Sequence, residues 1–92
     1  MRQLIAVLIL ALTSTIVYAG DYEDGMAAGR KGDFTTAVEK FKLSGEKGHV
    51  QAQFTLGLLY GAGQGVQKNK SESVKWYRMA AEQGHAIAQY SL

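Results

Sequence analysis

Apolar residues recur at helical spacing along most of the chain. A first, weak stripe at i, i+3, i+4 and i+7 contains two glycines: Tyr22, Gly25, Met26 and Gly29. A second stripe with the same spacing consists of Phe34, Ala37, Val38 and Phe41. Asp33 precedes this second stripe in the position of a helix N-cap. The pattern predicts a helix from there to about Glu46, with Gly45 fraying its last turn and a stop near Gly48.

A third helix is predicted to begin at His49. Its apolar face at i, i+4, i+7 and i+8 consists of Ala52, Leu56, Leu59 and Tyr60. Gly57 lies inside this helix, where glycine costs about 1 kcal/mol relative to alanine. We expect a neighbouring helix to pack closely at Gly57, because such packing explains a glycine at this position.

Glycines separate this helix from a fourth one. The run over residues 61–65, Gly-Ala-Gly-Gln-Gly, is predicted to break the helix, and Val66 is predicted to return the loop to the core. Asn69 and Glu72 have the spacing of a capping box, with Asn in place of Ser or Thr. Gly84 is expected to end the fourth helix. The predicted buried stripe of that helix consists of Ser73, Trp76, Tyr77 and Ala80, with Ala81 beside it.

The sequence repeats with a period of 36 residues. Residues 48–56, Gly-His-Val-Gln-Ala-Gln-Phe-Thr-Leu, return at 84–92 as Gly-His-Ala-Ile-Ala-Gln-Tyr-Ser-Leu (84 − 48 = 36). A period of this size is typical of stacked supersecondary units. Because the helices are joined by short turns, the period predicts an all-α fold. The expected architecture is an α-α superhelix, a solenoid of antiparallel helix pairs in a short array.

The first 19 residues have the composition of a signal peptide. One positive charge in the Met-Arg-Gln start precedes an unbroken apolar run over residues 4–12. Residues 17–19, Val-Tyr-Ala, fit the small-x-small cleavage pattern. We therefore expect cleavage between Ala19 and Gly20, followed by export to the periplasm or secretion. The alternative is a membrane anchor, but a bilayer span needs about 20 apolar residues. No stable membrane anchor is expected after cleavage.

Composition narrows the function classes further. The 92 residues carry a net charge of +2, with acids and bases interspersed, so the basic stripe of a nucleic-acid-binding protein is missing. The chain has no cysteine, which excludes disulfides, thiolate metal sites and lipid attachment through cysteine. It has 11 glycines and no proline, which suits helices separated by tight turns. No cofactor is predicted.

Residues 48–92 resemble the Sel-one-like repeat family, relatives of the tetratricopeptide repeats. The residues that match the family pattern are Ala52, Leu56, Gly57, Tyr60, Gly63, Gly65, Val66, Val74, Trp76, Tyr77, Arg78, Ala80, Ala81, Glu82, Gln83, Gly84 and Ala88. Residues 20–47 are similar to a degenerate preceding unit. In that unit Lys40 takes the tryptophan place and Gly45 an alanine place. The expected division is a signal peptide at 1–19, a degenerate unit at 20–47, a repeat at 48–83 and an incomplete repeat at 84–92.

The resemblance implies a right-handed superhelix and a non-catalytic scaffold or adaptor for a protein or peptide. The implied repeat core consists of Ala52, Leu56, Gly57, Tyr60, Val66, Trp76, Tyr77, Ala80 and Ala81. Secreted bacterial members include cysteine-rich proteins that bind β-lactam compounds. Their disulfides cannot form in this cysteine-free chain.

Two constellations invite a catalytic or metal-binding interpretation. Ser44 and Lys47 match the Ser-x-x-Lys motif of penicillin-interacting enzymes, but neither the Ser-Asp-Asn nor the Lys-Thr-Gly companion occurs. We therefore predict no hydrolase activity. His49 and His85 occupy equivalent places one repeat apart, so they are expected to lie too far apart to share one metal ion. They are interpreted as helix-start residues.

Two further motifs are interpreted as structural. The glycine run at 61–65 follows a helix and lacks a Gly-Lys-Ser/Thr ending, so it is interpreted as a turn rather than a phosphate loop. Trp76 and Tyr77 lie at helical spacing beside small residues, which favours a place in the core over a ligand-stacking role.

The functional surface is expected on the concave side, which the first helix of each pair lines in this architecture. The candidate residues of the third helix that lie off the buried stripe are Gln51, Thr55 and Leu58. Leu58 among polar neighbours suits contact with a peptide, although an ordinary packed leucine is the alternative.

The function predicted from the sequence is non-catalytic protein–protein interaction outside the cytoplasm. One alternative is binding of cell wall or β-lactam with weak hydrolase activity. Another is that the chain is a piece of a longer repeat protein. The incomplete last repeat lacks a polar capping helix, so self-association or pairing with another repeat protein is also expected.

Overall fold

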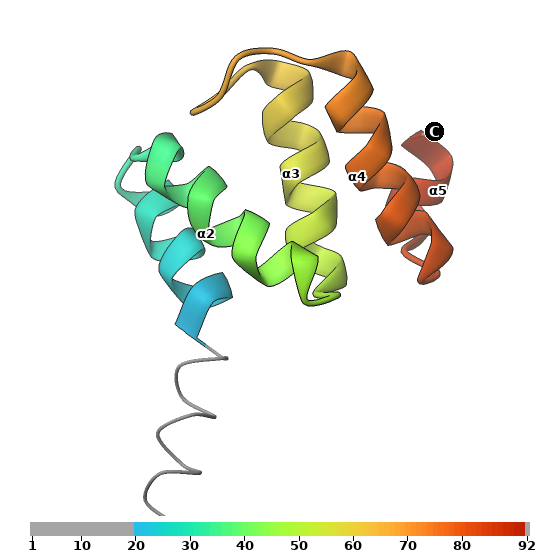
Figure 1. Ribbon diagram of the computed structural model, residues 1–92, viewed down its shortest axis with the longest axis horizontal. Coiled ribbons are helices and arrows are strands. Elements are labelled where there is room, and N and C mark those ends of the chain that lie inside the picture. Colours follow the sequence, from blue (N-terminus) through green and yellow to red (C-terminus); the bar gives the residue numbers. More distant parts are fainter. Residues whose placement is uncertain (1–19, 92) are drawn as a thin grey trace, which may run out of the picture.

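The computed structural model describes residues 20–91, and the side chains of residues 20–90. Residues 20–30 are helical, and four labelled helices follow: α2 (Phe34–Glu46), α3 (Val50–Ala62), α4 (Lys70–Glu82) and α5 (Ala86–Ser91) (Figure 1). No strand occurs within this part of the chain. The all-α prediction is therefore confirmed. The expected signal peptide, with its cleavage site after Ala19, lies outside the described residues.

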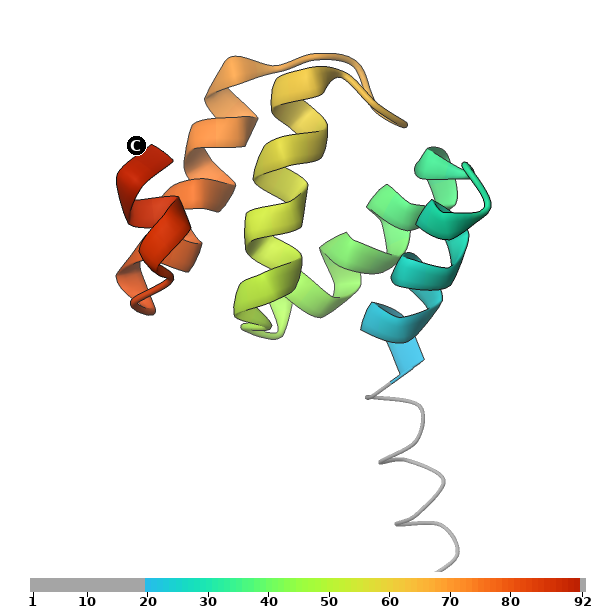
Figure 2. The ribbon, with the colours of Figure 1, turned by 180° about the vertical axis from the view of Figure 1, so that it is seen from behind.

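Successive helices run antiparallel and alternate between two layers. Helices α2 and α4 lie on one side, and helix 20–30, α3 and α5 lie on the other (Figures 1 and 2). Helix α3 is central, because it packs against both α2 and α4. The chain forms the expected short α-α superhelix. One face is lined by helix 20–30, α3 and α5, the first helices of successive pairs.

Polar side chains begin the helices at the predicted positions. Asp33 Oδ1 accepts a hydrogen bond from the Thr36 backbone N–H at 3.2 Å, and Asn69 Oδ1 accepts one from the Glu72 N–H at 3.0 Å. The capping box is only half formed, since the Asn69 backbone N–H already donates to the Tyr60 carbonyl at 3.0 Å. These caps satisfy backbone donors that would otherwise lack partners.

The cap at Asp33 makes the stability of α2 sensitive to acid. Hydrogen bonds from the Thr36 side chain and backbone lower the pKa of the Asp33 carboxyl. Because the pKa is lower in the folded state, the ionised Asp33 cap stabilises the fold. This stabilisation is complete above the unfolded pKa of about 3.9 and is lost as pH falls through the folded pKa. We expect Asp33→Asn, which retains a cap but does not titrate, to show a smaller fall in melting temperature between pH 5 and pH 2. Parallel curves for the two proteins would contradict this.

The third helix is longer than the sequence predicted. Helix α3 continues through Gly61 and ends at Ala62, and Gly63 caps it in the left-handed conformation with φ of 71°. Ser73 of α4 lies against Gly61: a Cβ there would be 3.1 Å from Ser73 Oγ. The same Oγ donates a buried hydrogen bond to the Gly57 carbonyl at 2.6 Å. Close packing of α4 therefore holds the glycine-rich end of α3.

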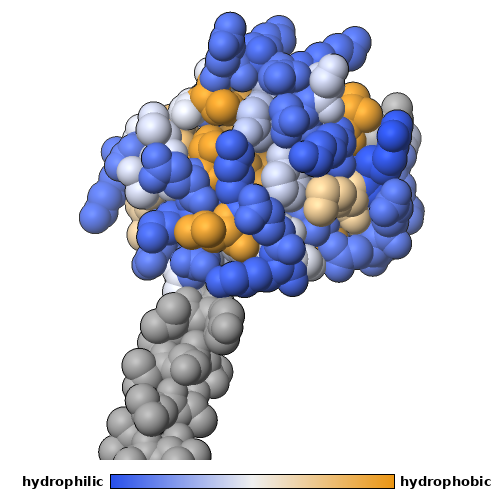
Figure 3. Space-filling view, in the orientation of Figure 1, coloured by the Kyte–Doolittle hydropathy of each residue, from blue (hydrophilic) through white to orange (hydrophobic). Residues whose placement is uncertain are grey.

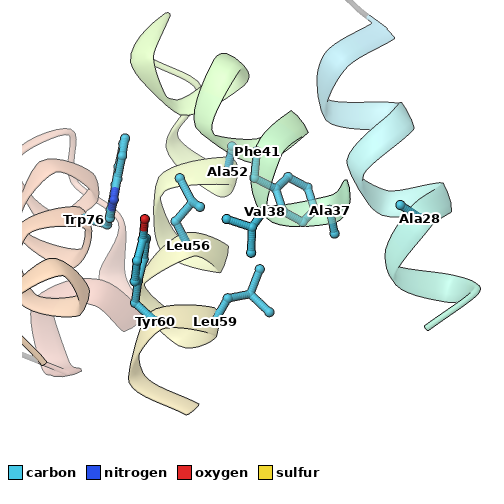
Figure 4. Packing of buried hydrophobic residues seen from close by; sticks show 9 residues of the cluster. All are labelled: Ala28, Ala37, Val38, Phe41, Ala52, Leu56, Leu59, Tyr60 and Trp76. Atoms are coloured by element: carbon cyan, nitrogen blue, oxygen red, sulfur yellow. The ribbon is translucent and has the colours of Figure 1, made fainter. Parts of the chain in front are cut away.

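The core lies between helix 20–30, α2, α3 and α4 (Figure 4). Its buried apolar residues are Ala28, Ala37, Val38, Phe41, Ala52, Leu56, Leu59, Tyr60 and Trp76. Ala80 of α4 and Ala88 of α5 are also buried. Val66, Tyr77 and Ala81, which were expected in the core, are only partly buried. Val66 packs against the edge of the core from the loop that joins α3 to α4, and Tyr77 lies along the side of α3. Partial burial of Tyr77 raises the pKa of its phenol.

Two glycines let helices approach closely. A Cβ at Gly57 would lie 2.5 Å from Tyr77 Cδ1, so α4 does pack at the glycine inside α3. The expectation that Gly45 frays the end of α2 is wrong. Gly45 is helical and buried, and a Cβ there would be 3.0 Å from the Trp76 ring and 3.2 Å from Leu56. Its missing side chain makes room for the tryptophan of the next helix pair.

Successive helix pairs meet through the same ring contacts. Tyr22 stacks on His49 with centroids 4.2 Å apart, and Phe54 stacks on His85 at 4.5 Å. Tyr22 also lies 5.7 Å from Phe41, as Phe54 lies 5.6 Å from Tyr77. Tyr22 and Phe54 are 32 residues apart, whereas His49 and His85 are 36 apart. Residues 20–47 thus form a helix pair whose connecting loop is four residues shorter (36 − 32 = 4).

A buried glutamine supports the junction between pairs. Gln53 is 2% exposed, and its Nε2 donates to the Gly45 carbonyl at 2.9 Å. Its Oε1 accepts from Gln83 Nε2 at 2.7 Å. One repeat later, Gln89 Nε2 donates in the same way to the Ala81 carbonyl at 3.0 Å. Because a buried amide needs hydrogen-bond partners, the bonds of Gln53 fix how the second pair sits on the first.

Candidate functional site

The surface of α3 that faces away from the core carries no charge. No residue of α3 is acidic or basic, and its outward positions include Gln51, Thr55 and Leu58. Gln51 is exposed, Leu58 is 48% exposed, and Thr55 is partly buried. The helix therefore offers a neutral surface with one prominent apolar side chain.

Hydrogen bonds already occupy the two polar candidates. The Thr55 hydroxyl donates to the Gln51 carbonyl at 2.8 Å, one turn earlier in the same helix. The Gln51 side-chain oxygen lies 3.2 Å from His85 Nε2. His85 Nδ1 accepts from the Ala88 backbone N–H, so the ring proton belongs on Nε2 and is donated to Gln51. These bonds use the Thr55 hydroxyl proton and the Gln51 side-chain oxygen, so the apolar surroundings become the more informative feature.

A cavity of about 250 Å³ opens beside this surface, between helix 20–30 and α3. Figure 2 shows these two helices with α2 behind them. Thr55 and Leu59 line the cavity from α3, and Phe34, Ala37 and Phe41 form its floor from α2. Four of these five side chains are hydrocarbon, so the cavity suits an apolar group.

The hollow is a consequence of glycines in helix 20–30. Gly25, Met26, Gly29 and Arg30 line that wall. A Cβ at Gly25 would be 2.8 Å from the Phe41 ring, so Gly25 lets α2 approach the helix. Gly29 lies one turn later with no neighbouring atom within 4 Å of where its Cβ would be. Gly25 thus lets Phe41, part of the cavity floor, lie close to helix 20–30, and Gly29 leaves the cavity unfilled.

Sequence reasoning missed this cavity. It took the two glycines as a weakness of the first apolar stripe. Glycines at i and i+4 on the inward side of an amphipathic helix were the available signal, because each one marks either a close approach or an unfilled space.

The cavity has one charged residue in its wall. Arg30 is exposed at the end of helix 20–30, and within residues 20–91 its guanidinium forms no ion pair. The opposite face of the molecule, which carries α2 and α4, is mostly hydrophilic with small separate hydrophobic groups (Figure 3). The apolar cavity and the uncharged surface of α3 therefore distinguish the face lined by helix 20–30, α3 and α5, which we call the inner face.

The two histidines begin helices. His49 Nδ1 accepts from the Ala52 backbone N–H at 3.2 Å, and His85 Nδ1 accepts from that of Ala88 at 3.2 Å. Each ring stacks on an aromatic side chain of the preceding pair. Within residues 20–91, no group of three or more His, Cys, Asp or Glu side chains could hold a metal ion.

The serine of the Ser-x-x-Lys motif is enclosed. Ser44 is 6% exposed in the last turn of α2, and its carbonyl accepts hydrogen bonds from the backbone N–H groups of Lys47 and His49. Lys47 Nζ donates to Asp21 Oδ2 at 3.0 Å. The residues of the motif hold the end of α2 and its turn in place.

Of the two residues with a possible ligand-stacking role, Trp76 is 4% exposed and lies within the core, and Tyr77 is partly buried beside α3. Among the described side chains, the two most exposed large apolar ones, Ile87 at 60% and Tyr90 at 93%, lie on helix α5. In the described part of the chain, no helix is long and apolar enough to cross a membrane.

Known proteins resemble this chain in sequence and in structure. The model of the Sel1 repeat family matches residues 50–85. The crystal structure of c5321, a protective antigen of uropathogenic Escherichia coli strains with an SLR fold, is 38% identical with a TM-score of 0.76. The match covers 80% of this chain and 17% of c5321.

A Sel1 repeat protein from Oxalobacter formigenes is 37% identical with a TM-score of 0.75, over 80% of this chain and 32% of its own. This chain thus spans less than a third of the length of either structure. No curated protein matches it significantly.

Proposed function

We propose that this chain, which belongs to the Sel1-like repeat family, is a non-catalytic adaptor that binds a protein partner on its inner face. Sel1 repeats generally mediate protein–protein interactions. The observation that carries the proposal is the cavity of about 250 Å³ beside the uncharged surface of α3. A partner segment lies along α3, contacts Leu58, and inserts one side chain into the cavity.

The energetics favour contact through apolar surface. Leu58 is 48% exposed beside a cavity whose floor is hydrocarbon. Covering apolar surface contributes roughly 25 cal/mol per Å², and a side chain that fills a preformed hollow also gains dispersion contacts. Anchors of this kind dominate the binding energy of many protein interfaces.

Filling the cavity from inside tests the proposal. We expect Gly29→Leu to place its side chain in the hollow, because Gly29 lines the cavity and no neighbouring atom lies within 4 Å of the Cβ position. Gly29→Ala is the matched control, since it removes the same glycine and adds only one methyl group. Both changes replace glycine in a helix, which favours folding by up to about 1 kcal/mol.

The readout is binding of peptides from a random library displayed on phage and selected on the wild-type protein. Selected peptides should bind Gly29→Ala with nearly wild-type affinity and Gly29→Leu at least about tenfold more weakly. If peptides selected on the folded wild-type protein bind Gly29→Leu equally well, the cavity is not the binding site.

Export is a second part of the proposal. It is supported by the charge, apolar run and small-x-small site of residues 1–19. We predict that the exported protein begins at Gly20. N-terminal sequencing of protein from a periplasmic fraction measures this directly, and an intact Met1 on membrane-bound protein would contradict it.

A further inference from the structure

The size of the cavity limits what enters it. Pockets for small molecules and cofactors usually have volumes of about 300–1,000 Å³ and several polar groups that fix orientation. This cavity has about 250 Å³, and its only polar side chains are Thr55 and Arg30. The Thr55 hydroxyl is engaged by the Gln51 carbonyl. A single large apolar side chain of a bound segment fits this space and this lining.

Charge is unevenly distributed along helix 20–30. Glu23 and Asp24 are exposed near its start, where Asp21 is paired with Lys47, whereas Arg30 ends the helix and Lys31 directly follows it. Arg30 and Glu23 are seven residues apart, which corresponds to about 10 Å along a helix. That separation is close to the screening length at physiological salt, so the two ends present different potentials to a bound segment.

Arg30 is the charged group nearest the anchor. It lines the cavity one turn after Met26, forms no ion pair within residues 20–91, and faces an uncharged α3. A carboxylate next to the anchor would therefore meet the guanidinium of Arg30 at this end of the cavity, whereas the exposed carboxylates of Glu23 and Asp24 lie toward the start of the helix. A basic residue at the same place would meet repulsion from Arg30.

We propose that the partner segment carries a large apolar residue with an acidic residue close to it in sequence, and that the acidic residue pairs with Arg30 while the apolar side chain fills the cavity. This inference rests on the proposed function and specifies its partner. Guanidinium–carboxylate pairs form two parallel hydrogen bonds, so Arg30 fixes the direction in which the segment lies across helix 20–30 and α3.

Synthetic peptides test the pairing. Each has a Gly/Ser background with one fixed Phe and either Glu or Lys at a spacing of one to four residues on each side, and fluorescence anisotropy measures binding. At the best spacing we expect the Glu peptide to bind about five- to tenfold more tightly than its Lys counterpart at low salt. The preference should shrink at about 0.5 M salt, because a pair at the rim is screened.

Charge reversal provides the decisive comparison. Arg30→Glu should invert the preference in favour of Lys peptides. Lys31→Glu is the matched control: it makes the same change of charge on the neighbouring exposed residue, which does not line the cavity, and should preserve the preference for Glu.

The outcomes separate this inference from the proposed function. If Phe peptides bind, are blocked by Gly29→Leu, and show no preference for Glu that Arg30→Glu inverts, the cavity is the site but the acidic partner is wrong. If Lys31→Glu and Arg30→Glu have equal effects, general charge explains the preference and the pairing is also wrong. If no Phe peptide binds, or Gly29→Leu has no effect on binding, both proposals fail.

Discussion

Trp76→Ala is expected to destabilise the protein by about 3–5 kcal/mol, the usual cost of emptying a large aromatic site in a core. Trp76 is 4% exposed and belongs to the same buried cluster as Leu56 and Tyr60 (Figure 4). Its ring also fills the space left by Gly45 of the preceding pair. A domain of this size has a total stability of only about 4–11 kcal/mol, so the variant should be largely unfolded or close to it.

Urea and thermal denaturation followed by far-UV circular dichroism measure this effect. Trp76→Phe is the informative control. The indole Nε1 is buried without a hydrogen-bond partner in the described part of the chain, so losing it removes no bond while most of the ring remains. We expect Trp76→Phe to cost less than half as much as Trp76→Ala. Equal stability of Trp76→Ala and wild type would mean that the tryptophan is not part of the core.

Gly65→Ala is expected to have the second largest effect, a loss of about 2–5 kcal/mol. Gly65 has φ of +73°, a conformation that costs an alanine about 1–2 kcal/mol. A Cβ there would also overlap the backbone carbonyl of Phe34, the first residue of α2. Overpacking typically adds 1–3 kcal/mol, and a backbone group cannot move aside as a side chain can. The loop must therefore leave α2, which exposes Phe34 and deforms the floor of the cavity.

Gly48→Ala separates the two contributions. Gly48 has φ of +95°, but no atom lies within 4 Å of the Cβ position, so its substitution carries only the backbone cost. Denaturation midpoints of the two variants should differ by the packing contribution. If Gly65→Ala is no less stable than Gly48→Ala, the loop does not pack against α2 as described.

The sequence predicted most of the fold because local and long-range signals agreed. Apolar stripes, the caps at Asp33 and Asn69, and the 36-residue period all indicated antiparallel helix pairs. The glycine inside α3 was correctly interpreted as a close approach, because Gly57 interrupts an otherwise good helix. These signals follow from spacing along the sequence alone, within one helix or from one repeat to the next.

What the sequence did not reveal depends on contacts between repeats. An offset of 36 residues aligns α2, the second helix of the first pair, with α4. Helix 20–30, the first helix of that pair, aligns with α3 only at an offset of 32. Gly45 was taken for a fraying residue because the ring of Trp76, 31 residues later, was not known to lie on it. The cavity requires three helices to be placed together, so no local pattern shows it.

The position of a bound peptide tests the central claim most directly. Intermolecular nuclear Overhauser effects can be recorded between a selected peptide and the methyl groups of the labelled protein. The cavity model predicts contacts from one large apolar peptide side chain to the methyl groups of Met26 and Leu59, which line the cavity. Contacts confined to other methyl groups, such as those of Leu43 on the outside of α2, would contradict it.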